Sequence, residues 1–341
     1  MKYLFILFPV LMVVLLTACE QELPLPPNNA VPREVVYSEL VANSTPEVRV
    51  GKSKPVGPGI NTGFDLVENA DVQLLDKNGQ QLETLTYMKD SSNAMSVYRG
   101  KTMLDAGKNY KIQVMVPGLK TVTAMASIPP PFKVELQDTL RTLLNGRPVL
   151  RFHFTVNPIP GVKQYLVMEA VKQSVTTDTT FSYRGRRYRK SENDSLYQKV
   201  KNLPGCNPKK DSSFLNDYLR IPCYTQDENA DNNQIGGLNE NYNSILFTQS
   251  GKPLTTYFYI NATALSSNPA EAIAPVGRVL VYVKSVSKEY YDFLLTYEKV
   301  KRNPGLNSLI QAIQLRSNTQ GGLGIVGGSY QKLYYLYYDK L

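Results

Sequence analysis

Short apolar runs alternate with turn signals from residue 34 onward, a pattern typical of an all-β protein. The predicted strands of the first part cover residues 35–41, 47–50, 70–75, 94–99, 110–116 and 121–128. Turn segments rich in glycine, proline, asparagine and aspartate separate these runs. Pro129-Pro130-Pro131 then interrupts strand pairing, because proline lacks a backbone N–H donor. We therefore predict two β-sandwich domains, residues 33–130 and 131–341.

The second predicted domain opens with a strongly alternating segment. Leu150, Phe152 and Phe154 fall on one face of a strand, whereas Arg151 and His153 fall on the other. We expect the first three side chains to be buried and His153 to lie on the surface. Further strands are predicted at residues 164–171, 244–248, 255–265 and 278–287, with an aromatic strand at 333–338.

Two segments of this domain depart from the strand pattern. Residues 172–237 are polar and weakly periodic, which predicts a long insertion. Residues 287–302 place Tyr290, Leu294 and Tyr297 on one stripe at helical spacing, so we predict a C-terminal helix. The glycines of residues 321–324 lack the lysine and serine or threonine of a phosphate-binding loop, and we interpret them as strand turns.

The N-terminus carries an export signal. Lys2 precedes an apolar run, and Leu16-Thr17-Ala18-Cys19 follows that run as a lipobox. A transmembrane anchor needs about 20 apolar residues, and this run is shorter. We predict a lipoprotein signal peptide at 1–18, a lipid anchor on Cys19 and a lipidated tether at 19–32. The protein is then expected at the outer membrane, anchored in either the periplasmic or the surface leaflet.

Two cysteines remain after Cys19. An even pair in an oxidising compartment favours a disulfide, so we predict one between Cys206 and Cys223. Their spacing fits no zinc pattern, and the only histidine lies far away in the sequence. No metal or other cofactor is expected from these residues.

The densest basic cluster lies inside the insertion. Arginine binds phosphate or carboxylate groups through paired hydrogen bonds, and tyrosine stacks on rings. The cluster is therefore a candidate binding site for lipid-borne phosphate or an acidic partner, with a solvated loop as the alternative. Its members are Arg184, Arg186, Arg187, Tyr188, Arg189 and Lys190.

A weaker pattern follows the cluster. Asp227, Asn229 and Asp231 alternate like the first half of a calcium-binding loop. Asn232 and Leu238 then occupy the places where that loop needs glycine and glutamate. Calcium stays a weak candidate at these residues, and a solvated polar loop is the alternative.

Composition and charge narrow the class of protein. Hydrophobic residues at 42% and charged residues at 20% are typical of an ordered globular chain. The formal charge is +9, and removal of Lys2 with the signal peptide leaves +8. This charge suits contact with an acidic surface. We do not expect nucleic-acid binding, because no motif of that class accompanies the charge.

Six segments together resemble a known family, the Bacteroidota lipoproteins that carry domain of unknown function 4249. These segments are residues 67–72, 98–100, 106–110, 157–161, 287–294 and 317–325. The chain departs from the family pattern at Val326, where an aromatic residue is expected, and at Asn157, where an acid is common. The resemblance implies two immunoglobulin-like β-sandwiches and an association with TonB-dependent outer-membrane receptors. It supplies no reaction and no functional residues.

The expected function is therefore non-enzymatic binding, as an accessory to a TonB-dependent receptor that takes up an unknown ligand. One alternative is a surface hydrolase of glycans or peptides, whose paired carboxylates the sequence does not single out. A serine nucleophile would have only His153 as its base. Another alternative is an adhesive or envelope-structural module, using the basic cluster and the C-terminal tyrosines.

Overall fold

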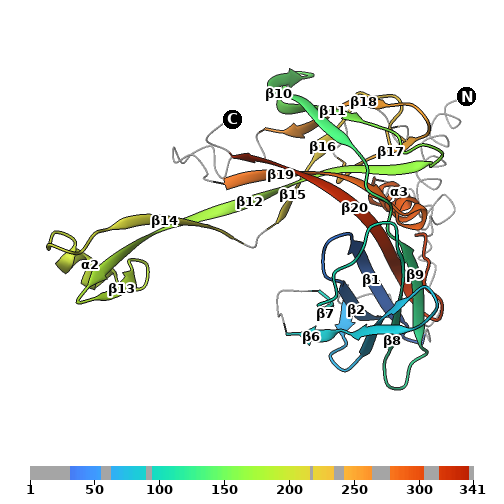
Figure 1. The fold of residues 1–341 in the computed structure, drawn as a ribbon, viewed down its shortest axis with the longest axis horizontal. Coiled ribbons are helices and arrows are strands. Elements are labelled where there is room, and N and C mark those ends of the chain that lie inside the picture. Colours follow the sequence, from blue (N-terminus) through green and yellow to red (C-terminus); the bar gives the residue numbers. More distant parts are fainter. Residues whose placement is uncertain are drawn as a thin grey trace, which may run out of the picture.

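A computed structural model describes residues 31–54, 63–89, 94–215, 218–233, 242–262, 277–302 and 315–337. The signal peptide, Cys19 and most of the tether lie outside the described residues. The protein is mainly β, as predicted, with two sandwich-like units (Figure 1). No helix among the described residues combines the length and the apolar character needed to cross a membrane. The immunoglobulin-like topology and the boundary at residue 130 stay predictions.

The first sandwich packs two sheets around one apolar core. One layer contains β1 (Glu34–Val41), β2 (Glu47–Ser53), β3 (Phe64–Leu66), β6 (Thr86–Met88) and β7 (Ser96–Arg99). The other layer contains β4 (Asp71–Asp76), β5 (Gln81–Thr84), β8 (Asn109–Met115) and β9 (Val122–Ser127). Alternate residues of these strands are buried, among them Leu40, Leu74 and Ile112. The alternation arises because successive side chains of a strand point to opposite faces.

The second sandwich repeats this arrangement with larger core residues. One layer contains β12 (Gln164–Tyr183), β15 (Leu219–Ile221), β17 (Ile245–Gln249), β19 (Gly277–Val286) and β20 (Leu323–Tyr337). The other contains β10 (Val134–Leu144), β11 (Arg147–Val156), β16 (Cys223–Tyr224) and β18 (Leu254–Asn261). Leu150, Phe152 and Phe154 are buried between them, as the alternating pattern predicts.

Strand β20 joins both sandwiches into one 12-stranded sheet. Its first half pairs in parallel with β1, and its second half pairs antiparallel with β19. Gly324 and Gly327 lie inside this strand, so the interpretation of residues 321–324 as turns is wrong beyond the bend at Gly321 and Gly322. Glycine occurs inside this strand because the side chain of Tyr290 packs directly against its backbone. A Cβ on Gly327 would lie 2.3 Å from Cγ of Tyr290.

Helix α3 (Lys288–Arg302) confirms the predicted helix and covers the face of the common sheet that points away from both cores. Tyr290 and Tyr291 are buried against this face, and Glu289 in the first turn complements the helix dipole. The helix lies over the junction of β1, β12 and β20. It therefore packs against strands from both sandwiches.

Much of the predicted insertion forms a projecting arm. Strand β12 continues past the sandwich to Tyr183 and carries β13 (Arg186–Arg189), α2 (Asp194–Val200) and β14 (Lys209–Phe214), which project from the body (Figure 1). Phe181, Val200 and Cys206 form a small core at its tip. Residues 176–180 are polar but contain four threonines, and β-branched residues favour extended strands, which explains why this part of the insertion is a ribbon.

The predicted disulfide is not formed. Cys206 belongs to the small core at the tip of the arm, whereas Cys223 belongs to the core of the second sandwich. Both thiols are free and buried. A disulfide requires Cα atoms about 4.4–6.8 Å apart, and cysteines in separate cores do not meet this condition. The prediction relied on compartment and number, which carry no distance information.

Candidate functional site

The basic cluster predicted from the sequence lies at the end of the arm. Arg184 and Gly185 form the turn between β12 and β13, with φ values of 49° and 74°. A pair of left-handed residues gives the turn that matches the twist of a two-residue hairpin. The turn places Arg186, Arg187 and Arg189 on the exposed strand β13. The structure therefore brings the cluster together at one projecting site.

The members of the cluster differ in their surroundings. Arg187 donates hydrogen bonds to Asp211 at 2.8 Å and to Thr180 at 3.0 Å. Tyr188 packs on the ring of Phe181 in the small core, so it supports the hairpin and is not a free stacking surface. Arg186 is exposed.

The other basic members also have near neighbours. The guanidinium of Arg184 lies over the ring of Tyr183, and the amine of Lys190 lies over that of Tyr197. Lys190 also approaches Asp194 at 3.9 Å. Arg189 is exposed. A depression of about 500 Å³ beside the hairpin is lined by residues of both charge signs, so it does not form a purely anionic or cationic pocket.

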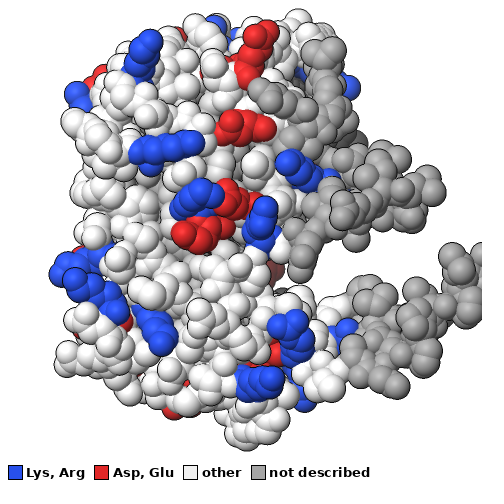
Figure 2. Space-filling view, turned by 90° about the vertical axis from the view of Figure 1, so that its right-hand side faces the viewer, with Lys and Arg blue, Asp and Glu red and all other residues white. Residues whose placement is uncertain are grey.

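The arm concentrates positive charge. Residues 174–214 contain nine lysines and arginines and four aspartates and glutamates, which gives a net charge of +5. The whole chain carries +9, so an eighth of its length holds more than half of its excess charge. On the side of the body away from the arm, Figure 2 shows acidic and basic side chains interspersed. The arm is the electrostatically distinct part of the described protein.

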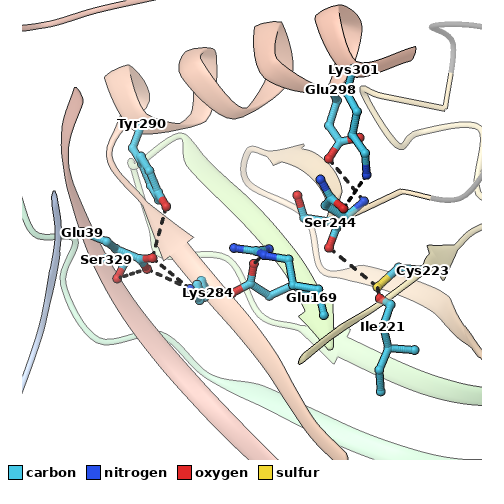
Figure 3. A network of polar contacts seen from close by, with 12 residues as sticks. Glu39, Glu169, Ile221, Cys223, Ser244, Lys284, Tyr290, Glu298, Lys301 and Ser329 are labelled. Carbon is cyan, nitrogen blue, oxygen red and sulfur yellow. Dashed lines mark hydrogen bonds and ion pairs between the residues drawn. The ribbon is translucent and has the colours of Figure 1, made fainter. Parts of the chain in front are cut away.

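A charged network that the sequence analysis missed lies where the two sandwiches meet (Figure 3). The amine of Lys284 in β19 lies 2.9 Å from Oε1 of Glu39 in β1 and 2.7 Å from Oε1 of Glu169 in β12. Arg220 donates to the other oxygen of Glu169 at 3.0 Å. Two cations and two carboxylates therefore compensate one another across the junction.

Neutral donors complete the coordination of Glu39. The hydroxyls of Ser329 and Tyr290 donate to its two oxygens at 2.7 Å and 3.2 Å, and Tyr37 lies 2.9 Å from the Tyr290 hydroxyl. These residues come from β1, β20 and α3. The network therefore fixes the strand shared by both sandwiches and the helix that covers it.

Burial and charge act against each other in this network. Burial lowers the pKa of Lys284, but the carboxylates of Glu169 and Glu39 outweigh it and raise that pKa above its usual range. Burial raises the pKa of Glu169, but Lys284 and Arg220 hold it below its usual value. Lys284 and Glu169 therefore favour their charged forms at neutral pH, and the arrangement fits a positioning role.

The weak calcium candidate has other partners in the structure. Asp227 accepts hydrogen bonds from the backbone and side chain of Asn229, each at 2.9 Å, and Asp231 accepts one from the hydroxyl of Tyr291. The two carboxylates thus serve a turn and a helix contact. Within the described ranges, no three His, Cys, Asp or Glu residues gather as a metal site would require.

His153 lies on the outer face of β11, where the alternation predicts it. Its Nδ1 lies 3.3 Å from Asp138, and its ring packs against Tyr257 at 4.6 Å. Arg151 donates to the same Asp138 at 2.9 Å and lies over Tyr257. The side chains form a cross-strand ladder of charged and aromatic groups, which stabilises neighbouring strands.

The fold defines a mainly β protein of two sandwich-like units that share one sheet and carry a basic arm. A family model for a domain of unknown function (DUF4249) matches residues 20–333, and the chain therefore belongs to that family. This confirms the resemblance seen in the sequence segments. No curated protein matches the sequence.

Proposed function

We propose that the protein is a lipid-anchored component of the outer membrane that binds a protein partner through its arm, without catalysing a reaction. The partner suggested by the family resemblance is a TonB-dependent receptor, for which the protein would act as an accessory in uptake. The observation that carries the proposal is the projection of the arm from the body together with its net charge of +5.

The low stability expected of the isolated arm supports a role in binding. Between the body and the small core at the tip, the arm consists of β12 and β14 paired through residues 175–180 and 209–214. Most side chains of β14 are exposed. A two-stranded ribbon is marginally stable by itself, because it buries little apolar surface. A partner that covers the ribbon would offset this deficit.

The charge of the arm supports an acidic partner surface. Clustered cations raise the rate of encounter with an oppositely charged surface, and they disfavour basic partners. The excess lies on Arg184, Arg186 and other exposed residues of the tip. An acidic region on the extracellular or periplasmic side of a receptor has the matching chemistry.

Chemical cross-linking in membranes tests the proposal. The full lipidated protein is cross-linked in cells, purified in detergent and examined for a receptor-sized partner by mass spectrometry. We expect the double variant Arg184→Glu and Arg186→Glu to lose most of the cross-linked partner. The control is Lys77→Glu with Lys120→Glu, which changes the charge equally at exposed positions of the first sandwich. Recovery of the wild-type protein alone, or equal losses in both variants, would overturn the proposal.

A further inference from the structure

The root of the arm contains an arginine held between two aromatic rings. The guanidinium carbon of Arg278 in β19 lies 3.8 Å from the ring centre of Phe214 and 4.8 Å from that of Tyr335. Its Nε donates to Oε1 of Gln173 at 2.8 Å, and Gln173 in turn donates to the carbonyl of Leu215 at 2.7 Å. The guanidinium is thus fixed in position by strands of the body and of the arm.

The two terminal nitrogens of this guanidinium have no hydrogen-bond partner among the described residues. Within the part of the chain that the structure describes, no ion pair joins Arg278 to a carboxylate, and only its Nε has a hydrogen bond. Other basic residues on the same face behave differently, since Arg220 and Lys284 are both paired with Glu169. Arginine binds a carboxylate through two parallel hydrogen bonds, and a preformed orientation reduces the entropy lost on binding.

Exposed aromatic side chains lie beside Arg278, on the same face of the sheet. Phe214, Tyr218 and Tyr335 are each between 40% and 51% exposed. Phe214 ends β14 at the root of the arm, Tyr218 precedes β15, and Tyr335 belongs to β20. Aromatic residues and arginine are enriched at the energetic centres of protein interfaces, where surrounding apolar groups exclude water. Exclusion of water strengthens the attraction between a guanidinium and a carboxylate.

We infer that this surface, defined by Arg278 and the three exposed aromatic residues beside it, binds an acidic peptide segment of a protein partner. The guanidinium takes one glutamate or aspartate carboxylate, and the apolar side chains take the residues beside it. Charge complementarity favours this occupant, because no carboxylate of the described residues pairs with Arg278 and the adjoining arm carries +5. The inference rests on the proposed function in that it names the chemistry through which the partner is bound.

Peptide titration of the full mature protein in detergent tests the inference. The probes are two fluorescein-labelled peptides, Gly-Leu-Glu-Leu-Gly and Gly-Leu-Gln-Leu-Gly, read by fluorescence anisotropy. We expect the glutamate peptide to bind at least about tenfold more tightly than the glutamine peptide. Arg278→Met keeps an unbranched side chain between the rings and is expected to abolish this preference. Arg99→Met removes the same charge from an exposed arginine paired with Glu47 and should leave the preference unchanged.

Three results would overturn the inference. Equal binding of both peptides would show an apolar site, and an unchanged preference in Arg278→Met would place the carboxylate elsewhere. Tighter binding of galacturonate than of the glutamate peptide would identify a glycan site instead. Thermal unfolding of each variant verifies that it is folded. Failure of the proposed function is separate, since it appears as loss of the cross-linked receptor from the wild type while the peptide preference persists.

Discussion

Lys284 of β19 and Glu39 of β1 form an ion pair at 2.9 Å across the junction of the two sandwiches. The side chain of Lys284 is only 9% exposed, and it also contacts Glu169. A buried pair of this kind gains little net stability over an apolar replacement, but removal of one partner leaves the other charge buried and uncompensated. The pair therefore fixes how the two sandwiches are joined.

Substitution of this lysine has a predictable cost. Lys284→Met should lower the free energy of unfolding by about 3 to 5 kcal/mol, because two carboxylates lose their shared cation. The control is Lys133→Met, which removes a lysine from the exposed pair with Glu135 at 2.6 Å. Solvent screens that pair, so a much smaller loss is expected. Urea unfolding of both variants at pH 7 measures the difference, and similar losses would contradict the positioning role.

Glu34 makes stability depend on pH. Burial raises the pKa of Glu34 to about 7, although the backbone amide of Val116 opposes the shift. A group with a raised folded pKa binds more protons in the folded state, so its contribution is fully present below about pH 4.5 and is lost as pH rises through 7.

The variant Glu34→Gln should remove this dependence. At pH 8 it is expected to be more stable than the wild type by about 1–2 kcal/mol, which is less than the full conversion of the pKa difference because water screens the charge. At pH 4.5 the two proteins should differ little. Denaturant unfolding at both pH values gives the comparison, and an equal difference at the two values would show that Glu34 does not titrate in this range.

The two cysteines should behave as thiols. Because Cys206 and Cys223 are free and lie in separate cores, both should react with iodoacetamide in denaturant without any reductant. Burial raises the pKa of the Cys223 thiol above its usual range, so this residue should resist alkylation in the folded protein. Mass spectrometry of the protein purified without reductant counts the alkylated cysteines. If Cys206 and Cys223 both stay unlabelled in denaturant, the predicted disulfide is present after all.

The sequence predicts local features of this fold well and its long-range pairing poorly. Alternation at Phe152 and Phe154 and the helical spacing of Tyr290 and Leu294 depend on neighbours in the chain, and the structure confirms both. The contact of Lys284 with Glu39 joins residues 245 positions apart, which no local pattern encodes. A lysine inside the apolar segment of β19 was the available signal, because a buried charge requires a partner.

The arm illustrates a second limit of sequence patterns. Its strands are polar on both faces, so the alternation that identifies a half-buried strand is absent from residues 176–180 and 209–214. The basic cluster was recognised from composition, but its projecting position depends on the continuous strand β12. Arg278 was not singled out, because its two ring partners lie on β14 and β20, far away in the sequence.

Gly327 allows α3 to pack closely on β20, and a double-mutant cycle can measure the coupling energy between residues 327 and 290. Gly327→Ala would place a Cβ 2.3 Å from Cγ of Tyr290, so the helix must shift. We expect a loss of about 1–3 kcal/mol, the range for overpacking a well-packed core. In the background Tyr290→Gly both the ring and the Cβ of residue 290 are absent, and the same substitution at Gly327 should cost far less. Denaturant unfolding of the four proteins yields the coupling energy, and a value near zero would show that the strand tolerates the methyl group without help from the helix.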